Sequence, residues 1–427
     1  MLTTALGLAV LFGSACHRGS PTNPSVTPPP VTDTSAPPQL SCPAPLAPTG
    51  RTFYVAMNQP GASNDRCDGS SPADNGNGHC PYKDFASAKT FALLRGVSGV
   101  RVEVRAGVYT FPDEAISIEG TGVSDFDRIV LAAYQNEAVV FDGRGALREV
   151  IRMGGRFTGL ERVTIRGAAA YNVEIGGGSD HIVQCNRFLA NVASDSLKGD
   201  NGAANVLIRH NDFSQWDSNA IDMTAIRNWR IEDNDFHDPK DSTGISVGAK
   251  FGSRDVFVTG NRIRNTRGFA LGGVSSPHAD DYETYNMRAE NNTFENVIGA
   301  IVRFYSCLNC AFNDNSAKAV GGGFVLFGEQ TDGPSGCAGG CKPTQGASIF
   351  RNRLTDLRGT PSNTFWGLYS TQAQGLTAGN NTYCTPSDQD GRFRFNDRDL
   401  TFPDWTTAVG TDASSISAKM NTALCNW

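Results

Sequence analysis

Charged side chains recur at equivalent positions of successive apolar segments in the middle of the chain. The segments DSLKGD, NAIDMT, GISVGAKF, FALGGVS, AIVRFYS, GFVLFGE and FWGLYS alternate apolar and polar residues, as β-strands with one buried face do. Alternation turns the apolar side chains inward and a set of polar side chains outward. The predicted outward set is Lys198, Asp200, Asp222, Thr224, Ser246, Lys250, Arg303, Tyr305, Glu329 and Tyr369.

The outward carboxylates predict a metal site if these strands stack in parallel, because neighbouring strands then lie about 4.8 Å apart. Asp200 and Asp222 would be roughly 5–7 Å apart, and Lys198 and Lys250 about 10 Å apart. Two carboxylates that are this close repel each other unless a cation or a proton lies between them. Ca²⁺ prefers oxygen ligands, so we expect Asp200 and Asp222 to be its ligands.

The same face could carry out a β-elimination on a uronate sugar. A bound cation neutralises the sugar carboxylate and makes the adjacent proton more acidic, and a basic side chain can then remove that proton. Lys198, Lys250 and Arg303 are the candidate bases or neutralising groups. The candidate substrate-binding residues are Ser246, Tyr305, Glu329, Tyr369 and His278, the last in the long insertion SSPHADDYETYN. Alternatively, these polar side chains serve only solubility.

A repeated asparagine predicts how the strands are positioned. From about residue 156, units with an apolar pair, an Asn and a further apolar residue recur at intervals of 23 to 37 residues, as coils with loop insertions do. A corner needs a residue that tolerates a left-handed backbone, and stacked Asn amides can bond from coil to coil. The repeated residues are Asn186, Asn211, Asn234, Asn261, Asn292, Asn315, Asn352 and Asn381.

These patterns divide the chain into five segments. Residues 1–16 have the apolar character of an export signal and resemble a bacterial lipoprotein signal that ends at Cys16. Residues 17–50 are rich in Pro, Thr and Ser and predict an extended linker. Residues 51–155 predict an N-terminal cap and the first coils, with a short helix within 84–96. The repeats follow over 156–385, and 386–427 predict a C-terminal tail and cap.

The eleven cysteines support export, because removing Cys16 leaves an even number. The spacing suggests three short-range disulfides and one that fixes the tail, with Cys42 and Cys185 left over. The C-x-x-C pair at Cys307 could equally be two free thiols, and a zinc site is disfavoured because no second pair follows at ligand spacing. The suggested pairs are Cys67–Cys80, Cys307–Cys310, Cys337–Cys341 and Cys384–Cys425.

The composition limits the partners. The formal net charge is −6, with 37 basic and 43 acidic residues well mixed, which does not favour nucleic acid as a partner. A local surface can still bind an acidic polysaccharide. No segment after the first has 18 consecutive apolar residues, so we expect membrane contact only through a lipid anchor at Cys16. We expect a secreted or envelope-anchored monomer.

The order of elements resembles that of secreted right-handed parallel β-helix proteins. The strand RTFYVAM, the turn PYKDFASA and the strand VEVRAGVYTF are similar to the N-terminal cap of many bacterial members. The tail resembles an F-x-x-W…G-x-D-x-x-S ending found on β-helix proteins linked to polysaccharide degradation. Its residues are Phe402, Trp405, Gly410, Asp412 and Ser415.

This resemblance implies an all-β right-handed parallel β-helix with a short N-terminal capping helix. The chain is similar to the pectate lyase-like polysaccharide lyases, although no motif matches one lyase family residue by residue. The implied function is an exported polysaccharide lyase that acts on a uronate-containing polymer with Ca²⁺. Two alternatives stay open: a non-catalytic, adhesin-like protein that binds glycans at the cell surface, and a glycoside hydrolase on the same fold.

Overall fold

The computed structural model describes residues 42–96, 98–111, 113–240, 244–271, 281–321, 323–327, 342–356, 365–368, 373–386, 393–420 and 422–425. The chain divides into two units, Met1–Asp33 and Thr34–Trp427, and every described residue belongs to the second. The expected export signal, Cys16 and Cys337–Cys341 therefore lie outside the described residues. None of the helices among the described residues is long and apolar enough to cross a membrane.

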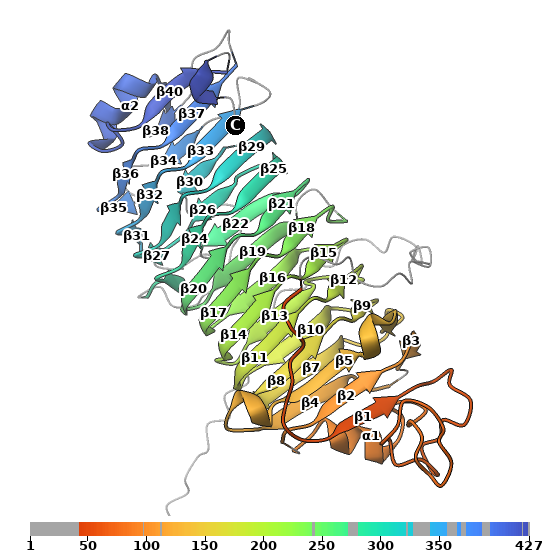
Figure 1. Cartoon of the computed structure of the whole chain (residues 1–427). Coiled ribbons are helices and arrows are strands. Elements are labelled where there is room, and N and C mark those ends of the chain that lie inside the picture. Colours follow the sequence, from red (N-terminus) through yellow and green to blue (C-terminus); the bar gives the residue numbers. More distant parts are fainter. Residues whose placement is uncertain are drawn as a thin grey trace, which may run out of the picture. The chain divides into compact units, whose positions relative to one another are not determined.

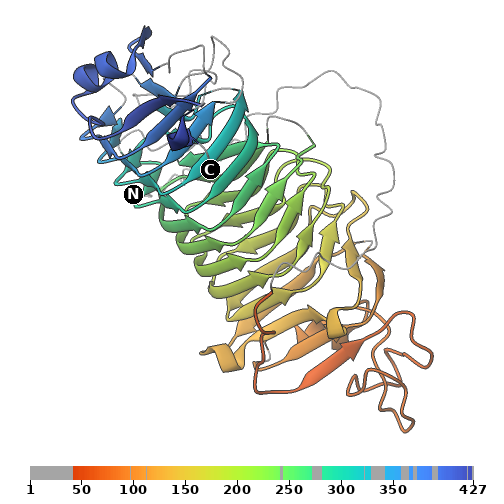
Figure 2. The ribbon, with the colours of Figure 1, turned by 45° about the horizontal axis from the view of Figure 1, so that its top comes forward.

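The second unit is a right-handed parallel β-solenoid, in which short strands wind in coils along one axis (Figures 1 and 2). Each coil contributes strands to three faces, and every face is a ladder in which a strand pairs with its counterpart one coil later. The expected fold class is confirmed in this respect.

The first face begins after the cap and carries the candidate site. Its strands are parallel except for the last, which returns antiparallel. They are β4 (Ile116–Thr121), β7 (Glu149–Arg156), β10 (Tyr171–Gly176), β13 (Leu197–Asp200), β16 (Asn219–Thr224), β19 (Ile245–Lys250), β22 (Arg267–Leu271), β26 (Val302–Phe304), β30 (Val325–Phe327), β34 (Trp366–Leu368), β38 (Phe393–Phe395) and β39 (Arg398–Leu400).

The second face follows the first in each coil. Its main strands are β1 (Thr52–Val55), β2 (Arg101–Val104), β5 (Ile129–Ala133), β8 (Thr158–Glu161), β11 (Ser179–Gln184), β14 (Ala204–Arg209), β17 (Arg227–Glu232), β20 (Ser253–Thr259), β24 (Arg288–Glu290), β28 (Ala311–Asn313), β32 (Ser348–Phe350) and β36 (Thr377–Gly379). A short side ladder consists of β23 (Thr284–Tyr285), β27 (Cys307–Leu308), β31 (Thr344–Gln345) and β35 (Ala373–Gln374).

The third face closes each coil and forms a separate sheet. Its strands are β3 (Gly107–Thr110), β6 (Val139–Asp142), β9 (Thr164–Arg166), β12 (Arg187–Phe188), β15 (Asp212–Ser214), β18 (Asp235–His237), β21 (Arg262–Arg264), β25 (Thr293–Ile298), β29 (Ser316–Gly321), β33 (Arg353–Asp356), β37 (Thr382–Thr385) and β40 (Ile416–Lys419).

The core is a stack of apolar side chains inside the coils. On the first face, Leu197, Ile221, Val247 and Val302 are fully buried and follow one another in register, as the alternation predicted. On the third face, phenylalanine rings stack directly, with ring centroids 4.3 Å apart in the first pair and 4.9 Å in the second. Burial of one large apolar residue per strand stabilises every coil against its neighbours.

The repeated asparagines form one buried ladder between the second and third faces. Each side-chain Nδ2 donates to Oδ1 of the next asparagine at 3.0–3.1 Å, and the backbone N–H donates to the same Oδ1 at 2.9–3.0 Å. The expected ladder is thus confirmed for all eight residues. Every rung satisfies groups that burial would otherwise leave unpaired.

The expected backbone conformation of the ladder asparagines is wrong. The left-handed residue of each corner is the one before the asparagine, including Cys185 at φ 59° and His210 at φ 54°. The separation of these two roles between neighbouring residues has a physical reason. The preceding residue turns the chain, and the asparagine, with an ordinary backbone, can aim its amide along the solenoid axis.

The C-terminal tail ends the ladder. Helix α2 (Phe402–Val409) begins at the capping residue Thr401 and ends at Gly410, whose φ of 67° is left-handed. Trp405 is fully buried in the last coils, with its ring 5.1 Å from that of Trp366. Asp412 accepts from Nδ2 of Asn381 at 3.1 Å, so the last asparagine also has a partner.

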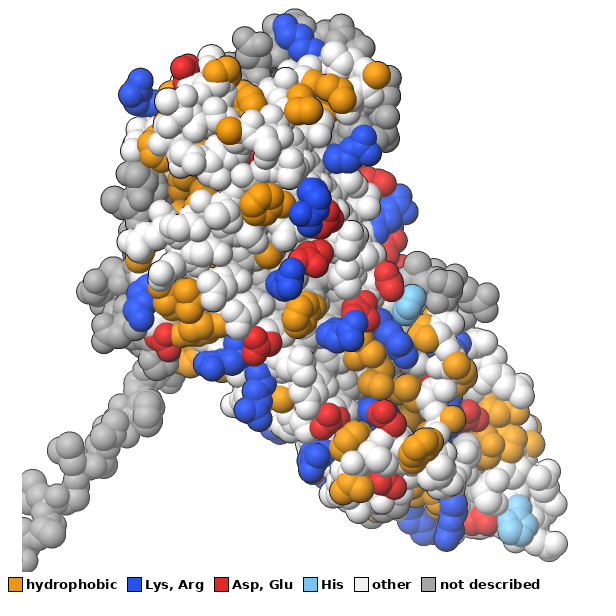
Figure 3. Space-filling view, turned by 60° about the vertical axis from the view of Figure 1, so that its left-hand side comes forward, with side chains coloured by type: hydrophobic (Ala, Val, Ile, Leu, Met, Phe, Trp, Pro, Cys, Tyr) orange, Lys and Arg blue, Asp and Glu red, His pale blue; other side chains and the backbone are white. Residues whose placement is uncertain are grey.

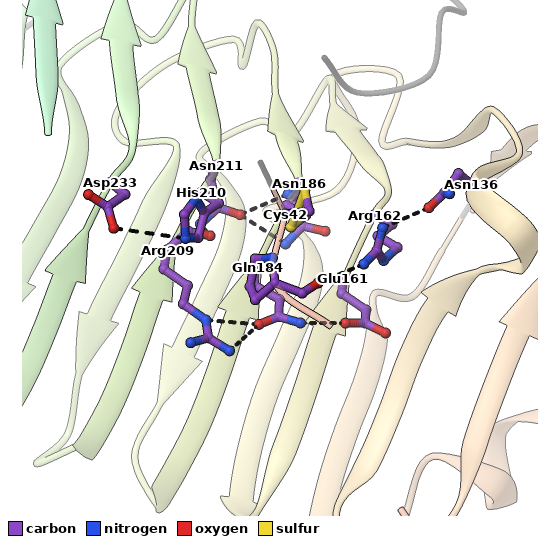
Figure 4. Close-up of a disulfide and its surroundings, with 12 residues drawn as sticks. Cys42, Asn136, Glu161, Arg162, Gln184, Asn186, Arg209, His210, Asn211 and Asp233 are labelled. Carbon is purple, nitrogen blue, oxygen red and sulfur yellow. Dashed lines mark hydrogen bonds and ion pairs between the residues drawn. A yellow bond between two sulfur atoms is a disulfide. The ribbon is translucent and has the colours of Figure 1, made fainter. Parts of the chain in front are cut away.

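Residues 42–50 lie along the solenoid, although the sequence placed them in the linker. Cys42 forms a disulfide with Cys185, the two cysteines that the spacing left over. Beside this disulfide, Nε2 of Gln184 donates to Oε2 of Glu161 at 2.6 Å (Figure 4). Oε1 of Glu161 accepts from Arg101, and its Oε2 also accepts from the backbone N–H of Leu46 at 3.2 Å. The disulfides Cys67–Cys80, Cys307–Cys310 and Cys384–Cys425 are formed as suggested.

A six-residue helix, α1 (Ala88–Leu93), begins at the capping residue Ser87 inside the segment predicted to be helical. Its function as the cap of the solenoid stays a prediction. Three single turns of 3-10 helix complete the elements: η1 (Asp125–Asp127), η2 (Tyr134–Asn136) and η3 (Ala423–Cys425).

Candidate functional site

The candidate site is a row of charged side chains across the first face. Strand pairing places Glu174, Lys198 and Asp222 at the same level of β10, β13 and β16, and the row continues through Gly248 and Ala270 to Arg303. Parallel pairing without a register shift brings residues that are far apart in the sequence to neighbouring positions, about 4.8 Å apart. The row therefore runs parallel to the solenoid axis.

Asp222 is the centre of the cluster. Its side chain is almost fully buried, and its Oδ2 contacts the ammonium groups of both Lys198 and Lys250, the latter at 3.0 Å. Lys198 reaches Asp222 from the preceding coil and also donates to the hydroxyl of Thr224 at 2.8 Å. The two ammonium groups thus converge on one oxygen atom instead of lying about 10 Å apart, because each side chain bends toward the carboxylate between them.

The two lysines differ in exposure. The side chain of Lys198 is 12% exposed and that of Lys250 is 27% exposed. Burial lowers the pKa of Lys198, but the charge of Asp222 and the hydrogen bond to it outweigh burial and raise the pKa above its usual value. Lys198 therefore stays charged and suits neutralisation of an anion, whereas Lys250 is the one that a ligand reaches more easily.

A second carboxylate lies at the corner before β13. Asp195 is buried, and its Oδ1 accepts from the backbone N–H and the side-chain Nδ2 of Asn219 at 3.1 and 2.7 Å. Burial raises the pKa of Asp195 to about 6, and the negative charge of Asp222 adds to this effect. The cluster thus holds two carboxyl groups, one paired with two lysines and one whose pKa is raised by burial, as acid–base sites often do.

On the N-terminal side of Lys198, the row is occupied by charged side chains that pair with one another. Glu174 is buried, and Arg148 contacts its carboxylate at 3.3 Å while packing over the ring of Tyr171. Arg152 lies 3.9 Å from the same carboxylate. These groups are paired with one another, so they form a closed end of the cluster.

The row continues with two small residues on the C-terminal side of Asp222. Gly248 carries no side chain, and a Cβ atom added there would meet nothing closer than Oδ1 of Asn219 at 3.8 Å. The next position in the row is an alanine, Ala270, and the one after it is Arg303, which is half-buried. Within the described part of the chain, the Arg303 guanidinium has no hydrogen-bond or ion-pair partner. An anion above Gly248 would thus lie between Lys250 and Arg303.

Asp200 and Asp222 lie at different levels of adjacent strands. The register partner of Asp200 on β10 is Gly176, and its side chain accepts from Nδ2 of Asn201 at 2.7 Å. Asp222 is at the level of Lys198, so the two aspartates are diagonal neighbours. Their predicted role as a metal pair stays a prediction.

The donor set does not fit calcium. Asp222 is already neutralised by two ammonium groups, and Ca²⁺ needs six to eight oxygen ligands. No group of three or more His, Cys, Asp or Glu side chains in the described segments could hold a metal ion.

The candidate substrate-binding residues have different outcomes. Ser246 lies on the same side of β19 as Gly248 and Lys250, but it is fully buried, and its hydroxyl donates to the backbone carbonyl of Arg267 at 2.7 Å, so it is not exposed to a substrate. Tyr305 is half-buried directly after β26. Glu329, Tyr369 and His278 lie outside the described residues.

Asp195 and Glu174 were missed because of where they lie in the sequence. Asp195 occupies the corner, where alternation carries no information about side-chain direction. Glu174 belongs to YNVEIG, one coil before the first aligned segment, and extending the alternating pattern by one unit would have found it.

The solenoid resembles known structures at low sequence identity. The A-module of a mannuronan C-5 epimerase from Azotobacter vinelandii has a TM-score of 0.50 and 12% identity, covering 77% of this chain and 92% of that chain. A pectate lyase, Pel9A, has a TM-score of 0.40 and 14% identity, covering 88% and 81%. The surface adhesin PfbA of Streptococcus pneumoniae has a TM-score of 0.47 and 11% identity, covering 70% and 81%.

Similarity at this level of identity concerns the fold alone. No curated protein matches the chain in sequence. Residues 149–333, which include the candidate site from β7 to Arg303, match the family described as right handed beta helix region. This match, the three parallel faces and the similarity to the epimerase module together identify the chain as a right-handed parallel β-helix protein.

Proposed function

We propose that this protein is an exported protein that binds acidic polysaccharide along the first face and cleaves it by β-elimination. The observation that carries the proposal is the convergence of Lys198 and Lys250 on Asp222, in the same row as the small residues Gly248 and Ala270. Three cationic groups, the third being Arg303, thus border a stretch of the face without large side chains. The mannuronan C-5 epimerase, named for its action on mannuronan, supports the same class of substrate.

In this proposal, the sugar carboxylate lies above Gly248 between Lys250 and Arg303. Lys198 keeps its charge and holds Asp222 in place, and Arg303 neutralises the sugar carboxylate. Lys250 first gives its ammonium proton to solvent, and its free amine then accepts the proton next to that carboxylate. The electron pair of the broken C–H bond forms the C4=C5 double bond, and the glycosidic oxygen on C4 leaves and takes up a proton from solvent.

Hydrolysis is the second candidate, and Asp195 favours it. A buried carboxyl group with a pKa of about 6 near a second carboxyl group resembles the acid and base pair of glycosidases. In this alternative, Asp195 would protonate the leaving oxygen. Its burial argues against direct contact with a substrate, so elimination is the preferred reaction.

The test is incubation of the purified chain with pectate, alginate and glycosaminoglycan, with two readouts. Elimination produces both ultraviolet absorbance of the unsaturated uronate and new reducing ends, whereas hydrolysis produces reducing ends alone. We expect both signals on at least one polymer, and their loss in Lys250→Met. Lys83→Met is the matched control, because Lys83 is exposed and distant from the first face.

Retained activity in Lys250→Met would exclude this lysine as the base. Reducing ends without absorbance, lost in Asp195→Asn, would replace elimination by hydrolysis. Binding without any product would leave the glycan-binding alternative as the function.

A further inference from the structure

A second polar surface lies on the second face, away from the candidate site. It is a groove of about 350 Å³ over β17, β20 and β24. Its eight lining residues include six outward side chains that form two rows of three. They are Arg230, Phe257 and Arg288 in one row, and Glu232, Thr259 and Glu290 in the other.

The two rows are in strict register and nearly symmetric about β20. Arg230 and Arg288 pair with Phe257 from either side, so one aromatic ring lies between two guanidinium groups on strands about 4.8 Å away on each side. In the second row, Thr259 lies between two carboxylates in the same way. Phe257, at the centre of the two rows, is 38% exposed, so its ring is not part of the apolar core.

The charges of the groove cancel within each strand. Nε of Arg230 donates to Glu232 at 2.6 Å, and Nη2 of Arg288 lies 2.8 Å from the Glu290 carboxylate. The pairs keep the guanidinium and carboxylate planes in fixed positions while leaving part of each group in contact with water. Basic and acidic side chains also lie next to one another, instead of in patches of one sign, along the coils in Figure 3.

This arrangement suits an uncharged sugar. A pyranose ring has an apolar C–H face, which packs on an aromatic ring, and a rim of hydroxyl groups, which bond to planar polar groups on either side. The hydroxyl of Thr259 has no partner within the described part of the chain and can donate or accept as well. An acidic sugar would instead have to compete with Glu232 and Glu290 for the arginines, at a cost in both ion pairs.

We propose that the second face holds a neutral glycan chain, with one sugar ring over Phe257 and its hydroxyl groups bonded to the flanking Arg–Glu pairs. The glycan runs parallel to the solenoid axis because the two rows do. This surface is separate from the cluster around Asp222, and it would bind a neutral polymer or the neutral part of a mixed polymer while the first face holds the acidic part.

The experiment is affinity electrophoresis of the full chain through gels that contain soluble β-glucan, galactomannan or dextran, with alginate as the acidic probe. We expect at least one neutral polymer to retard the protein. Phe257→Ala should weaken that interaction at least tenfold. Phe126→Ala is the matched control and should have no effect, because Phe126 is 64% exposed but lies in a turn near the N-terminal end of the solenoid.

Arg288→Ala provides a second variant and should also weaken the binding of the neutral polymer, even if Phe257→Ala lowers the yield of folded protein. Lys250→Met should bind the neutral polymer as the unchanged protein does, which separates this result from the outcome for the proposed lyase. The proposal is overturned if none of the three neutral polymers retards the protein. It is also overturned if Phe257→Ala binds them normally or loses affinity for alginate alone.

Discussion

Replacement of Asp195 by asparagine should stabilise the protein, and only above a certain pH. In the folded chain, burial and Asp222 raise the pKa of Asp195 to about 6, whereas an aspartate in the unfolded chain has a pKa near 4. The folded state therefore holds this proton more tightly. Ionisation of Asp195 destabilises the fold, and this destabilisation is absent below about pH 4 and complete above about pH 6.

The size of the effect follows from the shift. A difference of about two pKa units corresponds to about 3 kcal/mol at pH 7, and the side chain is buried enough for this conversion. Asparagine preserves the oxygen that accepts from both nitrogen atoms of Asn219, and it carries no charge. Asp195→Asn should therefore match the unchanged protein in stability at pH 4 and exceed it by up to about 3 kcal/mol at pH 7.

The assay is urea-induced unfolding at pH 4 and pH 7, followed by circular dichroism. The exposed Asp65 supplies the control, because Asp65→Asn should leave stability unchanged at both values of pH. If Asp195→Asn gains the same unfolding free energy at both values of pH, or gains none at pH 7, then ionisation of Asp195 does not destabilise the fold.

Three further predictions follow from the structure. Asn261→Ala should lower the free energy of unfolding in urea by about 3 kcal/mol, because the two Asn234 nitrogens that donate to its Oδ1 lose their acceptor. Asn58→Ala is the control and should change the free energy of unfolding little, because its hydrogen bond is exposed. Loss of the Cys42–Cys185 disulfide in Cys42→Ser should lower the thermal midpoint, since this bond closes a loop with a sequence separation of 143 residues, for which loop entropy gives about 5 kcal/mol. If the thermal midpoint of Cys42→Ser under non-reducing conditions equals that of the unchanged protein, the disulfide does not stabilise the fold by closing this loop. Gly248→Val should weaken the binding of acidic polymer, because its side chain would lie beside Asp222 in the row, where a Cβ atom meets no atom closer than 3.8 Å.

The fold could be predicted from the sequence because the asparagine repeat carries phase information. Each coil must present an amide at the same corner, and the position of Asn186 therefore determines which residues of the following strands face inward. The left-handed residue was misassigned because Asn is the usual left-handed residue in turns. Five of the eight residues before the asparagines are Asp, Asn or Gly, which favour this conformation, but Cys185 and Arg351 occupy the same position, so the signal is weaker than that of the invariant Asn.

The candidate site could be predicted only in part. Alternation correctly placed Lys198, Asp222 and Lys250 on one face, but it does not determine how far a long side chain bends. Both lysines reach the carboxylate between them, and this contact removes the need for a cation between Asp222 and Asp200. Pairing of Cys42 with Cys185 could not be deduced either, because a disulfide between a linker and a distant coil leaves no local pattern.

The most direct test of the proposed function is the affinity of the full chain for alginate and pectate as a function of salt concentration. The account predicts binding that weakens with added salt and drops at least tenfold in Lys250→Met and in Arg303→Met, with Lys83→Met unchanged. Equal affinity of all four proteins for both polymers would show that the first face does not bind acidic polysaccharide.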